Sequence, residues 1–347
     1  MKQLFKAHLS PALVKAVASL KDRVEIKSNG EILCWNLSMI RVFLPTDSVS
    51  LDNFSVVCDY RDFQKLEAVK GDVEFFYDKD TEELICKNNE VEVRISASEG
   101  VIFYPEKIDK ITFQNAITIP SHFLYHVIKR MSRFTGKDRG KNYRYKEYIY
   151  LNANDIVASD GYRLAIYKSK VEIPFDAYIC RDVFKALNLL LPITENVEIY
   201  ATEDFTVLLG LNKGVKVFEV YCENLEYYPN YHEVIKDLRF NHVFKLDRAM
   251  FKETKNAELV IMKITDNNAL LEFQTEDSKV CKQVNINNLT NSNLKIAFNS
   301  KFLLEGLEAI DGKYVEMKAI DNESITQFNN SDNSFTYYVM LVKIKEV

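Results

Sequence analysis

Two histidines are the first residues whose type and spacing could do chemistry. His122 and His126 lie four residues apart in a segment with helical spacing, which would place both imidazoles on one face, as in many zinc sites. No glutamate follows His122, and no third ligand stands nearby at zinc spacing. The six cysteines are far apart and form no Cys-x-x-Cys pair. The sequence therefore predicts no metal site and no cofactor, and a reducing, cytoplasmic environment.

Motifs for catalysis are absent from the sequence as well. It contains no Gly-x-Ser-x-Gly elbow, no Gly-Lys-Ser/Thr phosphate loop and no Gly-x-Gly-x-x-Gly turn. Acidic runs such as DKDTEE fall in turns between β-patterned segments, where contact with solvent accounts for them. We expect no catalytic residues, and a nucleic-acid-processing enzyme is the weakest of the alternatives that we consider.

Basic residues recur on the polar faces of the segments with helical spacing. In 121–134, for example, Lys129, Arg130 and Arg133 lie opposite the apolar face together with His126. A single stripe of this kind is usually a solvated helix face. Several stripes in a protein of net charge -5 indicate that positive charge is sorted toward one surface, where it could meet phosphate.

The elements that would position these residues repeat along the chain. A length of 347 residues favours two or three domains, and no apolar run is long enough for a membrane span or an export signal. Apolar spacing predicts helices that start near residues 10, 60, 121, 181, 247 and 299, and short β-patterned runs fill the intervals. Six such units would pair into three domains of two. The spacing alone leaves open the alternative that the six helices are evenly spaced by chance and not by repetition of one unit.

Four segments, in order, resemble a known family. ASDGYRLA, residues 158–165, resembles the Thr-Asp-Gly-(His/Tyr)-Arg-Leu-Ala signature of the bacterial DNA polymerase III β subunit, the sliding clamp. YYPNY at 227–231 is similar to its Phe-Pro-Asp-Tyr element. NSKFLLEGLEAI at 299–310 is similar to its Asn-x-x-Tyr-Leu-Leu-x-x-Leu helix, and YYVMLVKI at 337–344 to its closing strand.

The resemblance implies an α+β protein of three tandem domains of the DNA-clamp fold, each with two helices on antiparallel sheets. The expected domains are 1–112, 113–240 and 241–347. They would form a crescent that dimerises into a ring around duplex DNA, bound without sequence preference. Such a homodimer is a non-catalytic processivity factor in DNA replication. Its expected partners are the DNA polymerase III alpha subunit, the clamp loader complex and other proteins with a clamp-binding motif.

The resemblance also implies a peptide-binding cleft with apolar walls and an arginine at its rim. Carried over to this sequence, the cleft residues are Leu151, Ser159, Gly161, Tyr162, Arg163, Leu164, Val234, Ile235, Lys236, Tyr338, Met340, Leu341 and Val342. The residues expected to face DNA are Lys15, Arg23, His126, Lys129, Arg130, Arg133, Lys137, Arg139, Lys141, Tyr150, Lys185, Arg248, Lys252 and Lys255.

The sequence also departs from the family pattern at several positions. Leu341 stands where the family has proline, and Ser159 where it has threonine. The segment FKETKNAELVIMKI at 251–264 is shorter than the corresponding region of the family, which contributes to the joint of the ring. The alternative to a sliding clamp is therefore a clamp-derived binding module that keeps the peptide cleft but closes no ring.

Overall fold

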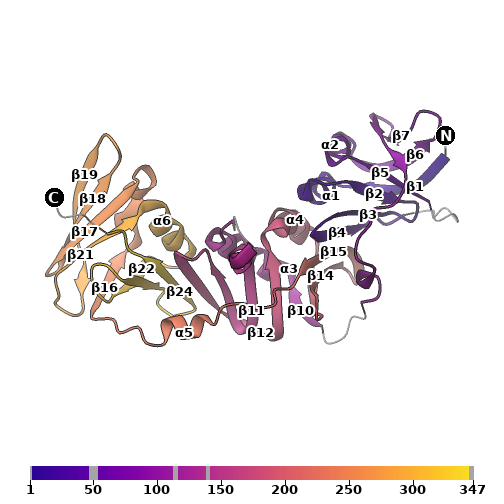
Figure 1. Cartoon of the computed structure of the whole chain (residues 1–347). Helices are drawn as coiled ribbons and strands as arrows, with labels where there is room; N and C mark the ends of the chain where they lie inside the picture. Colours follow the sequence, from indigo (N-terminus) through magenta and orange to yellow (C-terminus); the bar gives the residue numbers. More distant parts are fainter. Residues whose placement is uncertain (1, 47–53, 112–115, 138–140, 344–347) are drawn as a thin grey trace. The chain divides into compact units, whose positions relative to one another are not determined.

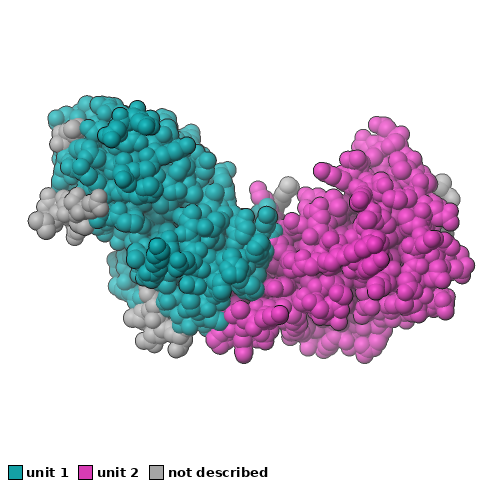
Figure 2. All heavy atoms as spheres, turned by 180° about the vertical axis from the view of Figure 1, so that it is seen from behind, with its two compact units in different colours: residues 1–129, 175–225 teal, residues 130–174, 226–347 magenta. Residues whose placement is uncertain are grey.

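The computed structural model describes residues 2–46, 54–111, 116–137 and 141–343, without the side chains of residues 141 and 142. The chain divides into two compact units, distinguished in Figure 2. Unit 1 comprises residues 1–129 and 175–225, and unit 2 comprises residues 130–174 and 226–347. None of the described helices is long and apolar enough to cross a membrane.

Five of the six predicted helical segments form α-helices, and side-chain caps account for several of the starts. Oxygens of Ser10, Asp247 and Asn299 accept hydrogen bonds from backbone N–H groups of the first turns that follow, as helix caps do. The segment after Asp247 forms 3-10 turns instead of an α-helix, and one short helix, α5, was not predicted. The helices are α1 (Pro11–Val17), α2 (Tyr60–Gln64), α3 (Ser121–Met131), α4 (Phe184–Leu190), α5 (Tyr231–Ile235), η8 (Arg248–Asn256) and α6 (Ser300–Ala309).

Unit 1 contains two antiparallel sheets (Figure 1). Its helices α1 and α4 pack against each other, and α1 also contacts strands of the larger sheet. The smaller sheet has the order β1 (Lys2–Leu9), β6 (Gly71–Asp78), β7 (Glu83–Lys87), β8 (Glu92–Ser96). The larger sheet has the order β10 (Ile117–Pro120), β13 (Asn196–Ala201), β14 (Phe205–Asn212), β15 (Val215–Glu223), β4 (Ser38–Phe43), β3 (Glu31–Asn36), β2 (Val24–Lys27), β5 (Ser55–Cys58), β9 (Ser98–Glu99).

Unit 2 likewise contains two antiparallel sheets. The larger has the order β11 (Tyr148–Ser159), β12 (Arg163–Cys180), β24 (Phe335–Met340), β23 (Ile325–Asn329), β22 (Tyr314–Ala319), β16 (His242–Asp247), β20 (Asn287–Asn288). The smaller has the order β19 (Lys279–Asn285), β18 (Asn268–Gln274), β17 (Leu259–Thr265), β21 (Leu294–Asn299).

Both larger sheets run across a predicted domain boundary. In unit 1, β15 pairs with β4, with Phe218 opposite Val42. In unit 2, β12 pairs with β24, with Arg163 opposite Val339. Strands from different predicted domains thus share one hydrogen-bonded ladder. This pairing explains why the two compact units do not coincide with the three domains predicted from the sequence.

A close approach between helix and sheet sets the position of α6 on β24. A Cβ atom on Gly306 would overlap the Tyr337 ring, so only glycine lets the helix lie this near to the strand. The Tyr337 hydroxyl donates a hydrogen bond to the Phe302 carbonyl at 2.8 Å. This contact matters for the site, because β24 also pairs with the first residues of β12.

The cysteines provide a direct test of this packing. Cys281 is exposed on β19, whereas the other five thiols are buried. Burial raises the pKa of Cys34, Cys58 and Cys86 to about 12, so at pH 8 these groups are protonated as well as shielded. We expect a thiol reagent such as DTNB to titrate one cysteine rapidly at pH 8 in the native protein and six in denaturant. Rapid reaction of more than one native thiol would contradict the packing described.

Candidate functional site

Three segments far apart in the sequence enclose one apolar cavity of about 310 Å³ in unit 2. They are the turn at 159–164, the element at 228–234 and the paired strand ends at Ile325 of β23 and Met340 of β24, and Tyr145 adds to the lining beside them. Three of the four segments that carry the family resemblance contribute to this lining. The lining residues are Tyr145, Ser159, Gly161, Tyr162, Arg163, Leu164, Tyr228, Pro229, Tyr231, Val234, Ile325 and Met340.

The turn at 159–164 is built by its own short polar side chains. Asp160 Oδ1 accepts hydrogen bonds from the backbone N–H groups of Tyr162 and Arg163, both at 2.9 Å. Gly161 has a φ of 88°, a conformation that glycine adopts without strain. The backbone N–H of Met340 donates to the Tyr162 carbonyl at 3.1 Å and so joins the closing strand to the turn. Asp160 and Gly161 therefore form the turn that carries Tyr162 and Arg163.

Arg163 lies in the cavity wall, but its charged group is turned into the protein. Its side chain is only 5% exposed, and its guanidinium forms ion pairs with Asp160, at 2.8 Å, and with Glu305 of α6. It also donates to the Arg133 carbonyl at 2.9 Å and lies 4.2 Å from the centre of the Phe302 ring. The expectation of an arginine at the rim is wrong for this guanidinium, because two carboxylates and an aromatic face already surround it.

Tyr162 remains at the surface, as expected. Its side chain is 61% exposed, and its ring stacks on that of Phe302 with centroids 6.2 Å apart. Of the other predicted cleft residues, Ser159, Gly161, Leu164, Val234 and Met340 also line the cavity.

The remaining predicted cleft residues lie behind or beside the cavity. Leu151 is fully buried. Tyr338 packs in the core behind the cavity, with Ile235 against it. Lys236 pairs with Glu233, and Leu341 and Val342 follow the end of β24, where the Val342 N–H donates to the Ala297 carbonyl at 2.9 Å.

A tyrosine wall was missed by the sequence analysis. Tyr145, Tyr228 and Tyr231 line the cavity, and the Tyr231 hydroxyl donates to Asp155 at 2.6 Å. Burial, together with this carboxylate, raises the pKa of Tyr231 above its ordinary value. Tyr150, predicted to face DNA, stacks on Tyr228 with ring centroids 4.6 Å apart, and its role in facing DNA stays a prediction. The many tyrosines in the segments NYRYKEYIY and EYYPNY were the feature of the sequence that could have predicted this wall.

Several cations predicted to face DNA are paired within the protein. Arg130 pairs with Asp311 at 2.6 Å and Arg133 with Glu308 at 3.3 Å. Together with Glu305, these acidic residues follow one another at spacings of three, in and just after α6, so they form a stripe that neutralises three arginines. Both arginines remain partly exposed, and their role in facing DNA stays a prediction.

Two further predicted cations are engaged elsewhere. Lys15 pairs with Glu67 at 3.2 Å. The Arg248 guanidinium donates to the carbonyls of Leu307, at 2.9 Å, and Ile310, where it satisfies the end of α6 instead of reaching outward.

Seven of the other predicted cations have exposed side chains. Arg139 and the side chain of Lys141 lie outside the described residues. The exposed residues are Arg23, His126, Lys129, Lys137, Lys185, Lys252 and Lys255.

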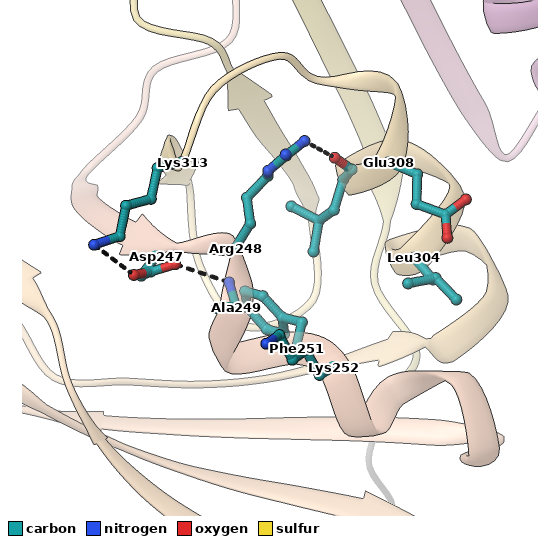
Figure 3. Close-up of a pocket in the computed structure, with 9 residues that line it drawn as sticks. Asp247, Arg248, Ala249, Phe251, Lys252, Leu304, Glu308 and Lys313 are labelled. Atoms are coloured by element: carbon teal, nitrogen blue, oxygen red, sulfur yellow. Dashed lines mark hydrogen bonds and ion pairs between the residues drawn. The ribbon is translucent and has the colours of Figure 1, made fainter.

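A second cavity of about 450 Å³ lies between η8 and α6, and Figure 3 shows its lining. Phe251 and Leu304 supply apolar surface, while Lys252 and Glu308 bring charge. Lys313 lies 3.5 Å from Asp247, the residue that caps η8.

Comparisons with known proteins agree with the resemblance. Residues 232–343 match the family model described as DNA polymerase III beta subunit, C-terminal domain. Beta sliding clamps of Staphylococcus epidermidis and Staphylococcus aureus are 27% and 26% identical to this chain over 203 and 192 residues. These matches cover 49% and 48% of this chain and 51% and 48% of the relatives. The chain thus spans about half the length of the curated relatives it matches.

Solved structures extend the likeness of fold to nearly the whole chain. DNA polymerase III beta subunits from Pseudomonas aeruginosa and Thermotoga maritima each superpose with a TM-score of 0.79 over 98% of this chain and 100% of theirs. Their sequences are 15% and 20% identical to it.

The fold is therefore the α+β clamp fold of these beta subunits, built on antiparallel sheets. The chain is thus similar in sequence to beta sliding clamps over about half its length, and residues 232–343 match the C-terminal domain of the DNA polymerase III beta subunit.

Proposed function

We propose that this protein is a DNA sliding clamp, a non-catalytic processivity factor that encircles duplex DNA and tethers the replicative polymerase. One observation carries the proposal: the turn at 159–164, the element at 228–234 and Met340, all placed by family resemblance, line one apolar cavity. A shared apolar cavity with an exposed methionine and tyrosine at its edge suits short peptides of varied sequence. The cavity residues described above are the proposed peptide site.

We further propose that the partners are duplex DNA, the DNA polymerase III alpha subunit, the clamp loader and other clamp-binding proteins, in the cytoplasm. The proposed domains are 1–112, 113–240 and 241–347. The family match at 232–343 supports the third of them.

A head-to-tail homodimer would close the ring. Among the described strands, β8 and β19 each form one edge of the smaller sheet of their unit and pair on one side only. Such an edge can accept a further strand from a second copy. Val280, on β19, is 52% exposed, which supports burial of this edge in the dimer.

Retention on circular DNA tests the proposal. With the clamp loader and ATP present, the protein should load onto closed circular duplex DNA, remain bound at high salt, and leave once the circle is cut. A ring holds by topology, so salt that screens phosphate contacts does not release it. Equal retention on circular and linear DNA would contradict a ring. That result would favour the second candidate, a peptide-binding module without a ring, which the internal pairing of Arg130 and Arg133 favours.

The unpaired cations should determine the salt dependence of DNA binding. Changing Lys129 and Lys252 together to alanine should lower the slope of log affinity against log salt by about 2, roughly one for each lost phosphate contact. Both side chains are exposed. Changing Arg130 to glutamine is the matched control and should leave the slope nearly unchanged, because Asp311 already neutralises this residue. A larger change for Arg130 than for the lysine pair would reverse the assignment.

A further inference from the structure

A lysine that forms no ion pair with any described residue lies against Gly161, a residue of the cavity lining. Lys146 belongs to η5 (Lys141–Glu147). The end of its side chain lies beside the Cα atom of Gly161, on the side where any other residue would carry its Cβ atom, and Gly161 lines the cavity. A Cβ atom on Gly161 would lie 2.9 Å from Lys146 Cε and 3.0 Å from Nζ. Within the part of the chain that the structure describes, the ammonium forms no ion pair, and it lies 4.5 Å from the centre of the Tyr143 ring.

The surrounding structure holds this lysine in place. The Gly136 N–H donates to the Lys146 carbonyl at 2.8 Å, and the preceding residue, Tyr145, forms part of the cavity wall. The absence of a side chain on Gly161 leaves room for the lysine chain, and any larger residue there would displace it. The backbone of Lys146 is therefore held beside the cavity wall, and the side chain has room to lie against Gly161.

Three other cations near the cavity are paired with carboxylates. A ligand carboxylate would find their charges compensated, because each has a carboxylate partner in the described structure. These pairs are Arg163 with Asp160 and Glu305, Lys236 with Glu233, and Lys168 with Asp155.

We propose that the cavity selects peptides in which an apolar anchor side chain is flanked by an aspartate or glutamate, whose carboxylate accepts a hydrogen bond from Lys146. This inference rests on the proposed function of the cavity as a peptide site. The apolar lining supplies the anchor contact, and the ammonium adds a charge-assisted hydrogen bond at its edge. A lysine acts as a compact point charge and does not require the fixed geometry of an arginine pair. Lys146 is thus a determinant of which apolar peptides bind.

Selection from a random peptide library displayed to the full chain tests the proposal. The unmodified chain should enrich peptides with an acidic residue beside an apolar anchor. Lys146→Met should enrich apolar anchors without that acidic residue, and Lys146→Glu should enrich basic residues in its place. Lys245→Met is the matched control, because Lys245 Nζ also lies over a partly exposed tyrosine ring, that of Tyr314, at 5.3 Å, but outside the cavity.

Affinities of one selected peptide, acetylated and amidated, make the test quantitative. The aspartate form should bind the unmodified chain and the Lys245→Met control about fivefold more tightly than its asparagine form, and this ratio should fall to about one for Lys146→Met. An unchanged ratio in Lys146→Met would overturn the inference and leave the peptide site intact. An acidic preference that requires a free C-terminal carboxylate would overturn the assignment to a side chain. Failure to enrich any apolar-anchored peptide would overturn the proposed function and the inference together.

Discussion

Replacing Glu305 with alanine is expected to destabilise the cavity wall of unit 2 by about 2 to 3 kcal/mol, because it removes one of two carboxylates from a buried guanidinium. The Arg163 side chain is 5% exposed and its guanidinium lies on the Phe302 ring. Without Glu305, Asp160 would be the one described carboxylate left to balance this buried positive charge. The turn at 159–164 should open more often, since Arg163 is part of it. Hydrogen exchange of residues 158–167, followed by mass spectrometry, measures this opening directly.

Glu308→Ala is the matched control for Glu305→Ala. Both residues lie on α6 and pair with an arginine, but Glu308 is 56% exposed and its partner Arg133 is 29% exposed. An ion pair in contact with water contributes little, so the expected change is within about 0.5 kcal/mol. If the two variants changed hydrogen exchange at 158–167 equally, Glu305 would have no special role in holding the turn.

Replacing Met340 with aspartate is expected to weaken peptide binding by about 30- to 100-fold, which corresponds to about 2 to 3 kcal/mol. Met340 lines the cavity with a side chain that is 53% exposed, so a carboxylate there would enter the apolar contact surface of the ligand. Fluorescence anisotropy with a peptide selected on the unmodified chain provides the measurement.

The fold should tolerate this change because the Met340 side chain is not part of the core. Its backbone bond to Tyr162 does not depend on the side chain, and thermal unfolding should shift little. Met340→Leu, which keeps an apolar side chain of similar volume, should retain affinity within about threefold. Peptide affinity that survives Met340→Asp would place the binding site elsewhere on the protein.

Local chemistry explains which features could be predicted from the sequence. Helix positions follow from apolar spacing and from caps such as Ser10 and Asp247, which act within a few residues. The turn at 160–161 depends on one aspartate side chain and one glycine, both visible in the sequence. Motif resemblance then placed the turn and Met340 in one cleft, which local pattern alone could not do.

Only the tertiary structure decided where the charges and the tyrosines lie. The sequence showed arginines on a polar helix face, and that pattern is the same whether they meet solvent, phosphate or another helix. Packing brings Glu305 to Arg163, 142 positions apart in the sequence, and Glu308 to Arg133, 175 positions apart. Likewise, Tyr150 lies on Tyr228 because two distant segments meet at the cavity. The sequence by itself thus determined the elements and the turn. Whether each cation is free or paired depends on contacts between distant residues, which form only when the chain packs.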